Sequence, residues 1–167
     1  PIIITQPVLL GLYDIDVVDV ESCYGDLTGE IHITASGGTG IISYSIDGGA
    51  TWFENDGHFV DLAAGFYYIQ IRDENDCMYI LNNPVVIHQP ALVVVSDVIV
   101  TDVTECYGNL NGAIDIMAYG GTGTMRYSID GGNTYEYNGG HFINVAGGSY
   151  NVFVKDANGC IMEYANN

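Results

Sequence analysis

The sequence predicts an all-β protein built from two tandem β-sandwich repeats of about seven strands each. The first observation behind this prediction is internal repetition, because the hexapeptide at residues 44–49 recurs unchanged at residues 127–132, 83 residues later. The second is a set of short runs that alternate polar and apolar residues, as half-buried strands do. The third is a series of Gly-rich turns about every eight to twelve residues, with no stretch of helical periodicity.

The repeat register holds along the chain without an insertion or a deletion. Matched residues include Gln6-Pro7 with Gln89-Pro90, Cys23 with Cys106, Cys77 with Cys160, and residues 1–4 with 84–87. We therefore interpret residues 1–7 as the tail of a preceding repeat, residues 8–90 as the first repeat and residues 91–167 as the second, in an excerpt from a longer array. The second repeat lacks the counterpart of residues 85–88. This predicts a short last strand and an unpaired edge, unless another chain supplies the equivalent of residues 2–4.

The first strands of the two repeats are expected at residues 8–20 and 92–103, where long apolar runs are interrupted by Asp. Residues 30–35 then alternate polar and apolar, which places Ile31, Ile33 and Ala35 on the core face of a strand.

The next element is predicted to be a tight hairpin. The strand that contains Tyr44 runs into Asp47-Gly48-Gly49, whose residues tolerate positive φ, and residues 51–53 return from the turn. A short strand follows at residues 58–62.

A tyrosine corner is expected at residues 62–67 and at 145–150, since each has an apolar residue, a Gly-containing turn and a Tyr that enters a strand. The corner residues are Tyr67 and Tyr150, whose phenols would bond the upstream backbone. The strand after the first corner would direct Tyr67, Ile69 and Ile71 inward, and residues 78–87 would form one closing strand. This strand order favours an immunoglobulin-like sandwich in each repeat, arranged end to end, because Pro90 makes the linker short and stiff.

Four cysteines, two per repeat at matching places, favour disulfides in an oxidising compartment. We favour pairing Cys23 with Cys77 and Cys106 with Cys160, each closing a loop expected to contribute roughly 3 to 4 kcal/mol. Free buried thiols are one alternative. A bond between Cys23 and Cys160, which would fasten one repeat to the next, is another.

The chain carries 21 acidic and 3 basic residues, a formal net charge of −18. This charge disfavours nucleic acid and anionic membrane surfaces as direct partners. No apolar run is long enough to span a bilayer, so direct membrane insertion is not expected.

The acidic turns near the end of each repeat are candidate calcium sites, because a hard cation prefers carboxylate, amide and carbonyl oxygens. The candidate ligands are Asp73, Asn75 and Asp76 in the first repeat, and Asp156 and Asn158 in the second. The same residue types form Asx turns that only satisfy their own backbone, and this alternative stays open.

Other chemistry is less well supported by the sequence. His58 recurs as His141, but no recurring Cys, Asp or second His lies at the spacing of a metal site. These histidines are therefore interpreted as structural turn residues. Ser45 and Ser128 recur on a strand, without a nucleophile elbow. The Gly-rich turn at residues 37–40 lacks the Lys and the helix of a phosphate loop, so we do not expect an enzyme. The aromatic residues after the hairpin, which include Trp52 and Tyr135, would pack at a strand edge or against a neighbouring repeat, with a sugar-binding platform as the alternative.

The unit resembles the SprB repeat of very large cell-surface adhesins from gliding Bacteroidota. The resemblance is carried by Cys23-Tyr24-Gly25 and by residues 29–35, 37–40, 44–49, 62–67 and 73–77, with their counterparts in the second repeat. The first repeat has Asp76 where the family pattern favours Gly, as at Gly159.

This resemblance implies export through the type 9 secretion system, an extracellular, outer-membrane-associated location, and adhesion during gliding motility. The expected partners are neighbouring repeats, surface polysaccharide or a solid substratum, and laterally associated chains. The alternative from another functional class is a carbohydrate-binding accessory module of a secreted multidomain protein.

Overall fold

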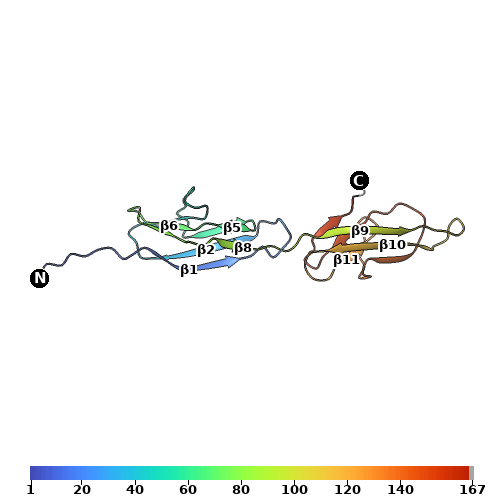
Figure 1. Cartoon of the computed structure of the whole chain (residues 1–167), viewed down its shortest axis with the longest axis horizontal. Helices are drawn as coiled ribbons and strands as arrows, with labels where there is room; N and C mark the ends of the chain where they lie inside the picture. The colour runs from blue at the N-terminus through green and yellow to red at the C-terminus, as the bar shows by residue number, and fades with distance from the viewer. Residues whose placement is uncertain (166–167) are drawn as a thin grey trace. The chain divides into compact units, whose positions relative to one another are not determined.

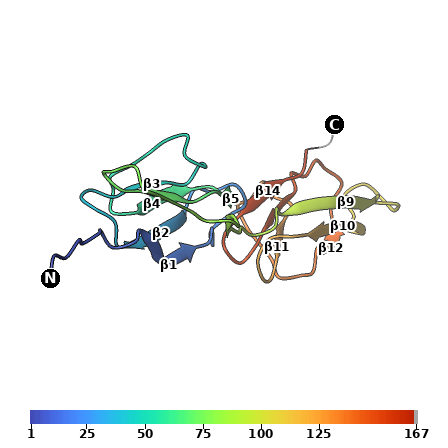
Figure 2. The ribbon, with the colours of Figure 1, turned by 60° about the vertical axis from the view of Figure 1, so that its left-hand side comes forward.

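The computed structural model describes residues 1–165, and among these residues it contains strands and turns but no helix (Figure 1). The all-β prediction is therefore confirmed. It follows that these residues include no helix able to cross a membrane. The chain forms two compact units, which can be followed by colour in Figure 2. Unit 1 comprises Pro1–Glu21 and Gly25–Gln89, and unit 2 comprises Ser22–Tyr24 and the chain from Pro90 onward.

Unit 1 is made of three small antiparallel sheets, ordered β1-β2-β4, β3-β6-β7 and β5-β8. Its strands are β1 (Gly11–Val18), β2 (Gly29–Ser36), β3 (Ser43–Ser45), β4 (His58–Leu62), β5 (Gly65–Tyr67), β6 (Gln70–Arg72), β7 (Met78–Ile80) and β8 (Val85–Ile87). The predicted inward residues Ile31, Ile33, Ile69 and Ile71 are all buried in one core. Alternation along β2 explains the burial of Ile31 and Ile33, because successive side chains of a strand point to opposite faces.

Unit 2 contains two antiparallel sheets, ordered β12-β10-β9 and β11-β13-β14. Its strands are β9 (Val94–Thr101), β10 (Gly112–Tyr119), β11 (Arg126–Ser128), β12 (His141–Val145), β13 (Phe153–Lys155) and β14 (Ile161–Glu163). Its core includes Ile114, Ile116 and Val154. No strand among the described residues takes the places that β5 and β8 hold in unit 1.

The strand count differs from the expected seven, since the described residues form eight strands in unit 1 and six in unit 2. The single closing strand expected at residues 78–87 is wrong. This segment is two strands, because β7 pairs with β6 whereas β8 pairs with β5 in another sheet. Pro84 lies directly before β8 and lacks the N–H group that would continue a ladder.

The first strand is kinked in both units. The pairing of β1 with β2 shifts register between Leu12 and Asp14, and the pairing of β9 with β10 shifts between Met117 and Ala118. Each shift leaves one residue of the first strand unpaired, as a β-bulge does, and so bends the strand.

After Tyr44 the chain returns antiparallel at Phe53 as predicted, but the tight form of the hairpin is wrong. Tyr44 and Phe53 form one isolated antiparallel bridge, in which their backbone N–H and C=O groups bond reciprocally at 2.8 and 2.9 Å. The loop between them is closed by side chains rather than by a ladder. Ser45 Oγ accepts from the N–H of Gly49 at 2.8 Å, and the Asp47 carboxylate accepts from the N–H of Thr51 at 2.9 Å.

Candidate functional site

The turn that precedes Cys160 is organised by one buried carboxylate. Asp156 Oδ2 accepts a hydrogen bond from the backbone N–H of Thr122 at 2.8 Å, and its Oδ1 accepts from the N–H of Cys160 at 2.9 Å. The side chain thus joins the Gly-rich turn after β10 to the turn that leads into β14. Hydrogen bonds between a carboxylate and backbone N–H groups are among the strong ones in proteins, so they stabilise this turn.

Unit 1 repeats this arrangement around Asp73, which accepts from the backbone N–H groups of Thr39, Asn75 and Cys77 at 2.9–3.0 Å. Burial raises the pKa of Asp73, but the backbone hydrogen bonds from Cys77, Thr39 and Asn75 outweigh it, and the net effect lowers this pKa. Asp76 has φ 59° and Gly159 has φ 92°, so Asp takes the left-handed conformation at the position where the second repeat has Gly.

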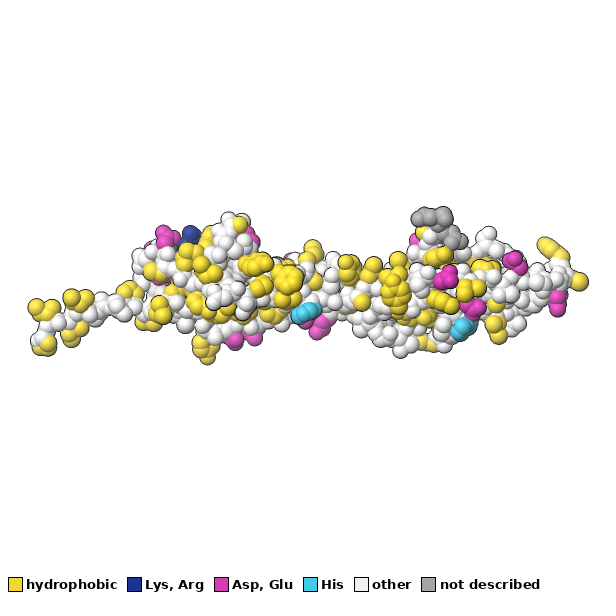
Figure 3. Space-filling model, viewed as in Figure 1, with side chains coloured by type: hydrophobic (Ala, Val, Ile, Leu, Met, Phe, Trp, Pro, Cys, Tyr) yellow, Lys and Arg dark blue, Asp and Glu magenta, His cyan; other side chains and the backbone are white. Residues whose placement is uncertain are grey.

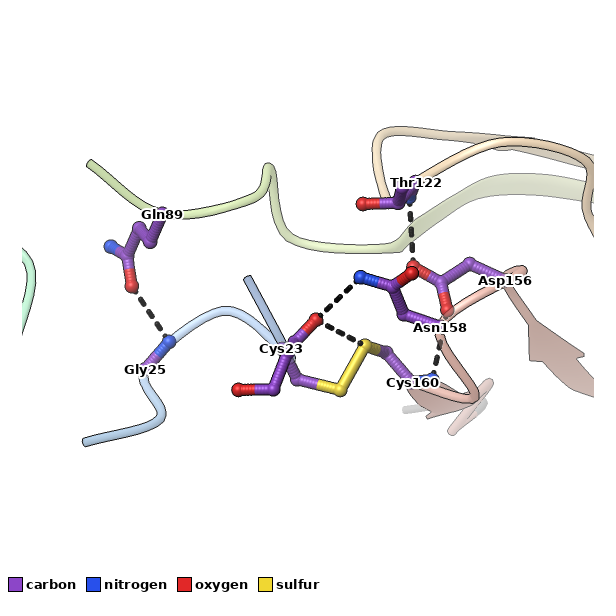
Figure 4. Close-up of a disulfide and its surroundings, with 8 residues drawn as sticks. Cys23, Gly25, Gln89, Thr122, Asp156, Asn158 and Cys160 are labelled. Atoms are coloured by element: carbon purple, nitrogen blue, oxygen red, sulfur yellow. Dashed lines mark hydrogen bonds between the residues drawn. A yellow bond between two sulfur atoms is a disulfide. The ribbon is translucent and has the colours of Figure 1, made fainter. Parts of the chain in front are cut away.

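The disulfide joins Cys23 to Cys160, with a Cα–Cα distance of 5.7 Å (Figure 4). The favoured pairing of Cys23 with Cys77 and of Cys106 with Cys160 is therefore wrong, and Cys77 and Cys106 are free, exposed thiols. The reason is the position of Ser22–Tyr24, which groups with unit 2 although the flanking residues belong to unit 1. Asn158 Nδ2 donates to the Ser22 carbonyl at 2.9 Å and fixes this segment beside Cys160.

The residues after Tyr24 return at once to unit 1, where the side chain of Gln89 secures them. The Gln89 Oε1 accepts from the N–H of Gly25 at 2.8 Å (Figure 4). Two further bonds hold the same turn, since Val20 N–H donates to the His88 carbonyl and His88 N–H donates to Asp19 Oδ1. The turn at residues 19–25 is thus held by the segment that follows β8.

A groove of about 330 Å³ lies beside the disulfide and is lined by Cys23, Tyr24, Leu92 and the turn residues around Cys160. The matching surfaces of the two repeats differ in exposure. Leu92 is 48% exposed, whereas its counterpart Leu9 is 89% exposed, and Tyr24 is 52% exposed, whereas its counterpart Tyr107 is fully exposed. The surface around Cys160 is therefore partly covered by Ser22–Tyr24.

Nearby carboxylates raise the pKa of the free thiol of Cys77. The charge of Asp73 is the largest cause of the raised pKa of Cys77, followed by burial, a hydrogen bond to Asp73 and the charge of Asp76. Since the thiolate is the nucleophile in thiol chemistry, a raised pKa favours a stable thiol over an activated one.

The calcium candidates lie together in their turns, but most have other described partners. The Asp73 and Asp156 carboxylates accept backbone hydrogen bonds, Asp76 forms an ion pair with Arg72 at 3.6 Å, and Asn158 donates to Ser22. Residues 1–165 contain no group of three or more His, Cys, Asp or Glu that could hold a metal ion. Calcium binding at these turns stays a prediction.

One recurring network was missed by the sequence interpretation. Ser45 is fully buried, donates from its hydroxyl to Asp47 Oδ1 at 2.7 Å and accepts from Gly49 N–H, while Thr51 donates to the same carboxylate from both its N–H and its hydroxyl. Hydrogen bonds from the side chain and backbone of Thr51, and then from Ser45, lower the pKa of Asp47 to about 2. The signal was available in the spacing, because Ser, Asp and Thr recur at 128, 130 and 134 with the same bonds.

The aromatic residues after this loop lie near cations in the described structure. The chain has three Lys and Arg residues in all, and each lies over a ring. The pairs are Arg72 over Trp52 at 4.4 Å, Arg126 over Tyr137 at 5.3 Å and Lys155 over Tyr135 at 5.5 Å. These rings therefore take part in cation–π packing within their own unit.

The tyrosines at the corners and the recurring histidines have local partners. Tyr67 and Tyr150 each donate from the hydroxyl to the carbonyl four residues upstream, to Ala63 at 2.7 Å and to Ala146 at 3.0 Å. The Nε2 atom of His58 lies 3.5 Å from Glu30 Oε2, and the Nδ1 atom of His141 lies 2.5 Å from Asp115 Oδ1.

A protein-family model described as the SprB repeat matches the chain at residues 15–51 and again at 98–134. Two stretches of the chain are thus similar to the SprB repeat. Each match runs from the first strand of a unit through the Ser–Asp–Thr network, and the two SprB matches keep the repeat offset of 83 residues. No curated protein and no solved structure matches the chain. SprB repeats occur in cell-surface proteins, which indicates that this chain is a repeat segment of a surface protein.

Proposed function

We propose that this chain is a structural and adhesive segment of a long filamentous adhesin, exported by the type 9 secretion system and used in surface attachment and gliding motility. The observation that carries the proposal is the pair of SprB matches at one constant offset. Repetition at a constant register gives an adhesin reach, because each unit adds length without a new fold. The proposed role is mechanical and adhesive, with no catalytic step.

The disulfide supports the mechanical part of this proposal. Cys23 and Cys160 are 137 residues apart in the sequence, so the disulfide carries a pulling force past the residues between them. In the chain-entropy model, closing a loop of this length contributes about 5 kcal/mol to stability. A covalent crosslink of this kind suits a filament that bears tension, because the residues it encloses are not extended while it is intact.

The adhesive part is supported by exposed aromatic side chains on an acidic protein. Tyr13, Phe66 and Tyr137 are each more than two-thirds exposed, and aromatic rings supply large apolar contact area with a polar tip in the case of Tyr. The net charge of −18 opposes adsorption to anionic surfaces. The proposed substratum is therefore a neutral polysaccharide or an apolar solid.

Adhesion can be tested by the retention of coated beads under flow. Beads that carry the 167-residue chain should be retained on polystyrene and on neutral polysaccharide longer than beads coated to equal charge with another acidic protein. The variant with Phe66→Ser and Tyr137→Ser keeps the net charge and should lose part of this retention. Equal wash-off of all beads would reject the adhesive role, and selective binding of one sugar on a glycan array would favour the carbohydrate-binding alternative.

A further inference from the structure

Two cations lie side by side on one face of the sheet β11-β13-β14 in unit 2. Arg126 in β11 is directly opposite Lys155 in β13 in the antiparallel register. The next residues along the strands, Tyr127 and Val154, are buried in the core, so Arg126 and Lys155 point to the outer face of the sheet. Like charges that lie directly opposite each other destabilise a sheet, and a bound anion would relieve this repulsion.

Two tyrosine rings hold these cations in place. Arg126 Cζ lies 5.3 Å from the centre of the Tyr137 ring, and Lys155 Nζ lies 5.5 Å from the centre of the Tyr135 ring. A cation–π contact is electrostatic and does not satisfy the N–H donors of the cation. Arg126 Nε has no hydrogen-bond partner, and neither cation forms an ion pair within residues 1–165. The described residues thus position both cations without neutralising them.

Carboxylates on the neighbouring elements do not neutralise this pair. Both oxygens of Asp130 accept hydroxyl hydrogen bonds within their own loop. Glu163 in β14 lies opposite Phe153, whereas Lys155 lies opposite Ile161. Figure 3 shows acidic side chains on both units and little of the dark blue of Lys and Arg. The outer face of β11 and β13 therefore carries a local positive charge in a chain whose net charge is −18.

Unit 1 carries the counterpart of Lys155 with its charge neutralised. This counterpart is Arg72, which lies over Trp52 at 4.4 Å and forms an ion pair with Asp76 at 3.6 Å. The counterpart of Asp76 in unit 2 is Gly159. The carboxylate that pairs with the cation of unit 1 is therefore missing from unit 2.

The second cation and its ring are also specific to unit 2. Ser43 and Glu54 of unit 1 take the places of Arg126 and Tyr137. Arg in place of Ser adds a positive charge, and Tyr in place of Glu removes a negative one. Three differences between the repeats thus shift the charge of one face in the same direction. Unit 1 shows that the sheet forms without this positive charge, so a binding role explains it better than a folding role.

We propose that the outer face of β11 and β13 binds a sugar residue that bears a carboxylate, a uronic acid within a largely neutral polysaccharide. The carboxylate would accept hydrogen bonds from the Arg126 guanidinium and the Lys155 ammonium, which are charge-assisted and therefore strong. The sugar ring would stack on Tyr137, whose side chain is 70% exposed. This inference rests on the proposed adhesive function and names the chemical group that unit 2 recognises.

The overall charge of the chain restricts which polysaccharides fit this face. The net charge of −18 repels a densely anionic polymer. Salt screens this repulsion beyond about 8 to 10 Å, so an isolated carboxylate that reaches the sheet meets mainly the two local cations. Widely spaced uronic acids in a neutral chain satisfy both conditions.

The first test is an NMR titration of the intact chain with the trisaccharide of galacturonic acid. Backbone amide signals of β11 and β13 should shift along a saturating curve. The methyl ester of the same trisaccharide keeps the sugar rings and loses the charge, so it should bind at least about tenfold more weakly. Equal binding of acid and ester, or no saturable shift with the acid, would overturn the proposal. Inorganic sulfate that binds as tightly as the trisaccharide would overturn the assignment to a sugar.

The second test compares two variants that each remove one Arg from the chain. Arg126→Ser introduces the residue that unit 1 has at this place, and it should weaken binding of the trisaccharide at least about tenfold. Arg72→Ser is the matched control and should stay within about twofold, because Arg72 lies in unit 1 and is paired with Asp76. Equal weakening by both variants would show that net charge sets the affinity, and would contradict a site on unit 2.

These titrations use neither polystyrene nor a neutral polysaccharide. A negative result would therefore leave the bead retention expected for the adhesive role unaffected. Specific binding of the trisaccharide together with equal wash-off of all beads would retain the site and reject the adhesive role.

Discussion

Cys23 and Cys160 lie 137 residues apart in the sequence and are joined by a disulfide. Both cysteines belong to unit 2, because Ser22–Tyr24 groups with that unit. When the chain is pulled from its ends, this bond should withhold the enclosed residues from extension. Single-molecule force spectroscopy should therefore show a contour length that is about 480 Å greater after reduction, at roughly 3.5 Å per residue. The variant with Cys77→Ser and Cys106→Ser is the control and should show the same gain. Equal lengths before and after reduction would mean that the bond is absent.

Asp156→Asn should lower the free energy of unfolding by about 2 kcal/mol. The buried carboxylate accepts one backbone N–H with each oxygen, from Thr122 and from Cys160, whereas an Asn amide has one accepting oxygen and turns N–H donors toward one of these groups. Urea denaturation measures the change. Glu163→Gln removes the same charge from an exposed position and should stay within about 0.5 kcal/mol. Similar losses in both variants would show that net charge, not the buried bonds, sets the effect.

The free energy of unfolding should fall in acid over the pH range in which Asp47 and Asp130 become protonated. The pKa of each is lowered from 3.8 to about 2, chiefly by hydrogen bonds from the side chains of Thr51 and Thr134. A carboxyl with a depressed folded-state pKa stabilises the fold fully above its unfolded pKa, so this contribution is present above pH 3.8 and is lost as the pH falls toward 2.

The residues behind this acid sensitivity can be identified by carboxyl NMR titration. Thr51→Val should raise the midpoint of Asp47 toward 3.8, and Thr134→Val should do the same for Asp130. Thr101→Val, at an exposed position in β9, should leave both midpoints near 2. Unchanged midpoints in the first two variants would contradict the assigned cause.

Gly57→Ala should cost at least about 3 kcal/mol. Gly57 has φ 76°, and an added Cβ would lie 2.1 Å from the backbone oxygen of Ile33, which cannot move without breaking β2. Gly65→Ala is the control, since an added Cβ there meets nothing within 4 Å. Thermal unfolding of the two variants should differ by several degrees or more, and comparable melting temperatures would contradict the packing argument.

Calcium binding at Asp73, Asn75 and Asp76, and at Asp156 and Asn158, makes a direct prediction. Calcium that binds the folded state alone should raise the melting temperature in proportion to the logarithm of its concentration, and a chelator should reverse the rise. Magnesium at the same ionic strength controls for screening of the acidic surface. The same melting temperature with calcium and with chelator would leave these residues as Asx turns.

The strand faces could be predicted from the sequence because their cause is local. Alternation along a strand decides which side chains reach the core, and Ile31, Ile33, Ile69 and Ile71 are buried as the pattern indicates. The bulge in the first strand of each unit was likewise signalled by the Asp residues that interrupt an apolar run.

Only part of the candidate site could be predicted from the sequence. The acidic turns and the cysteines stand out by their recurrence, and so does the Ser–Asp–Thr spacing once its bonds are known. The role of Ser45 was missed because a serine on a strand is usually exposed, and only the folded loop shows its hydroxyl enclosed between Asp47 and Gly49.

By itself, the sequence determined an all-β chain made of two similar repeats. Alternation of polar and apolar residues and the repeat at an offset of 83 residues can both be read directly from the order of residues. Only the tertiary structure decided the partner of Cys23, since a disulfide depends on which backbone segments meet after folding. Ser22–Tyr24 groups with unit 2, and the bond from Asn158 to Ser22 holds it there. Loop-closure entropy favoured the wrong pairing only weakly, because it varies with the logarithm of loop length. The folded backbone, which places Cys23 beside Cys160, therefore decided the pairing, although the two cysteines are 137 residues apart in the sequence.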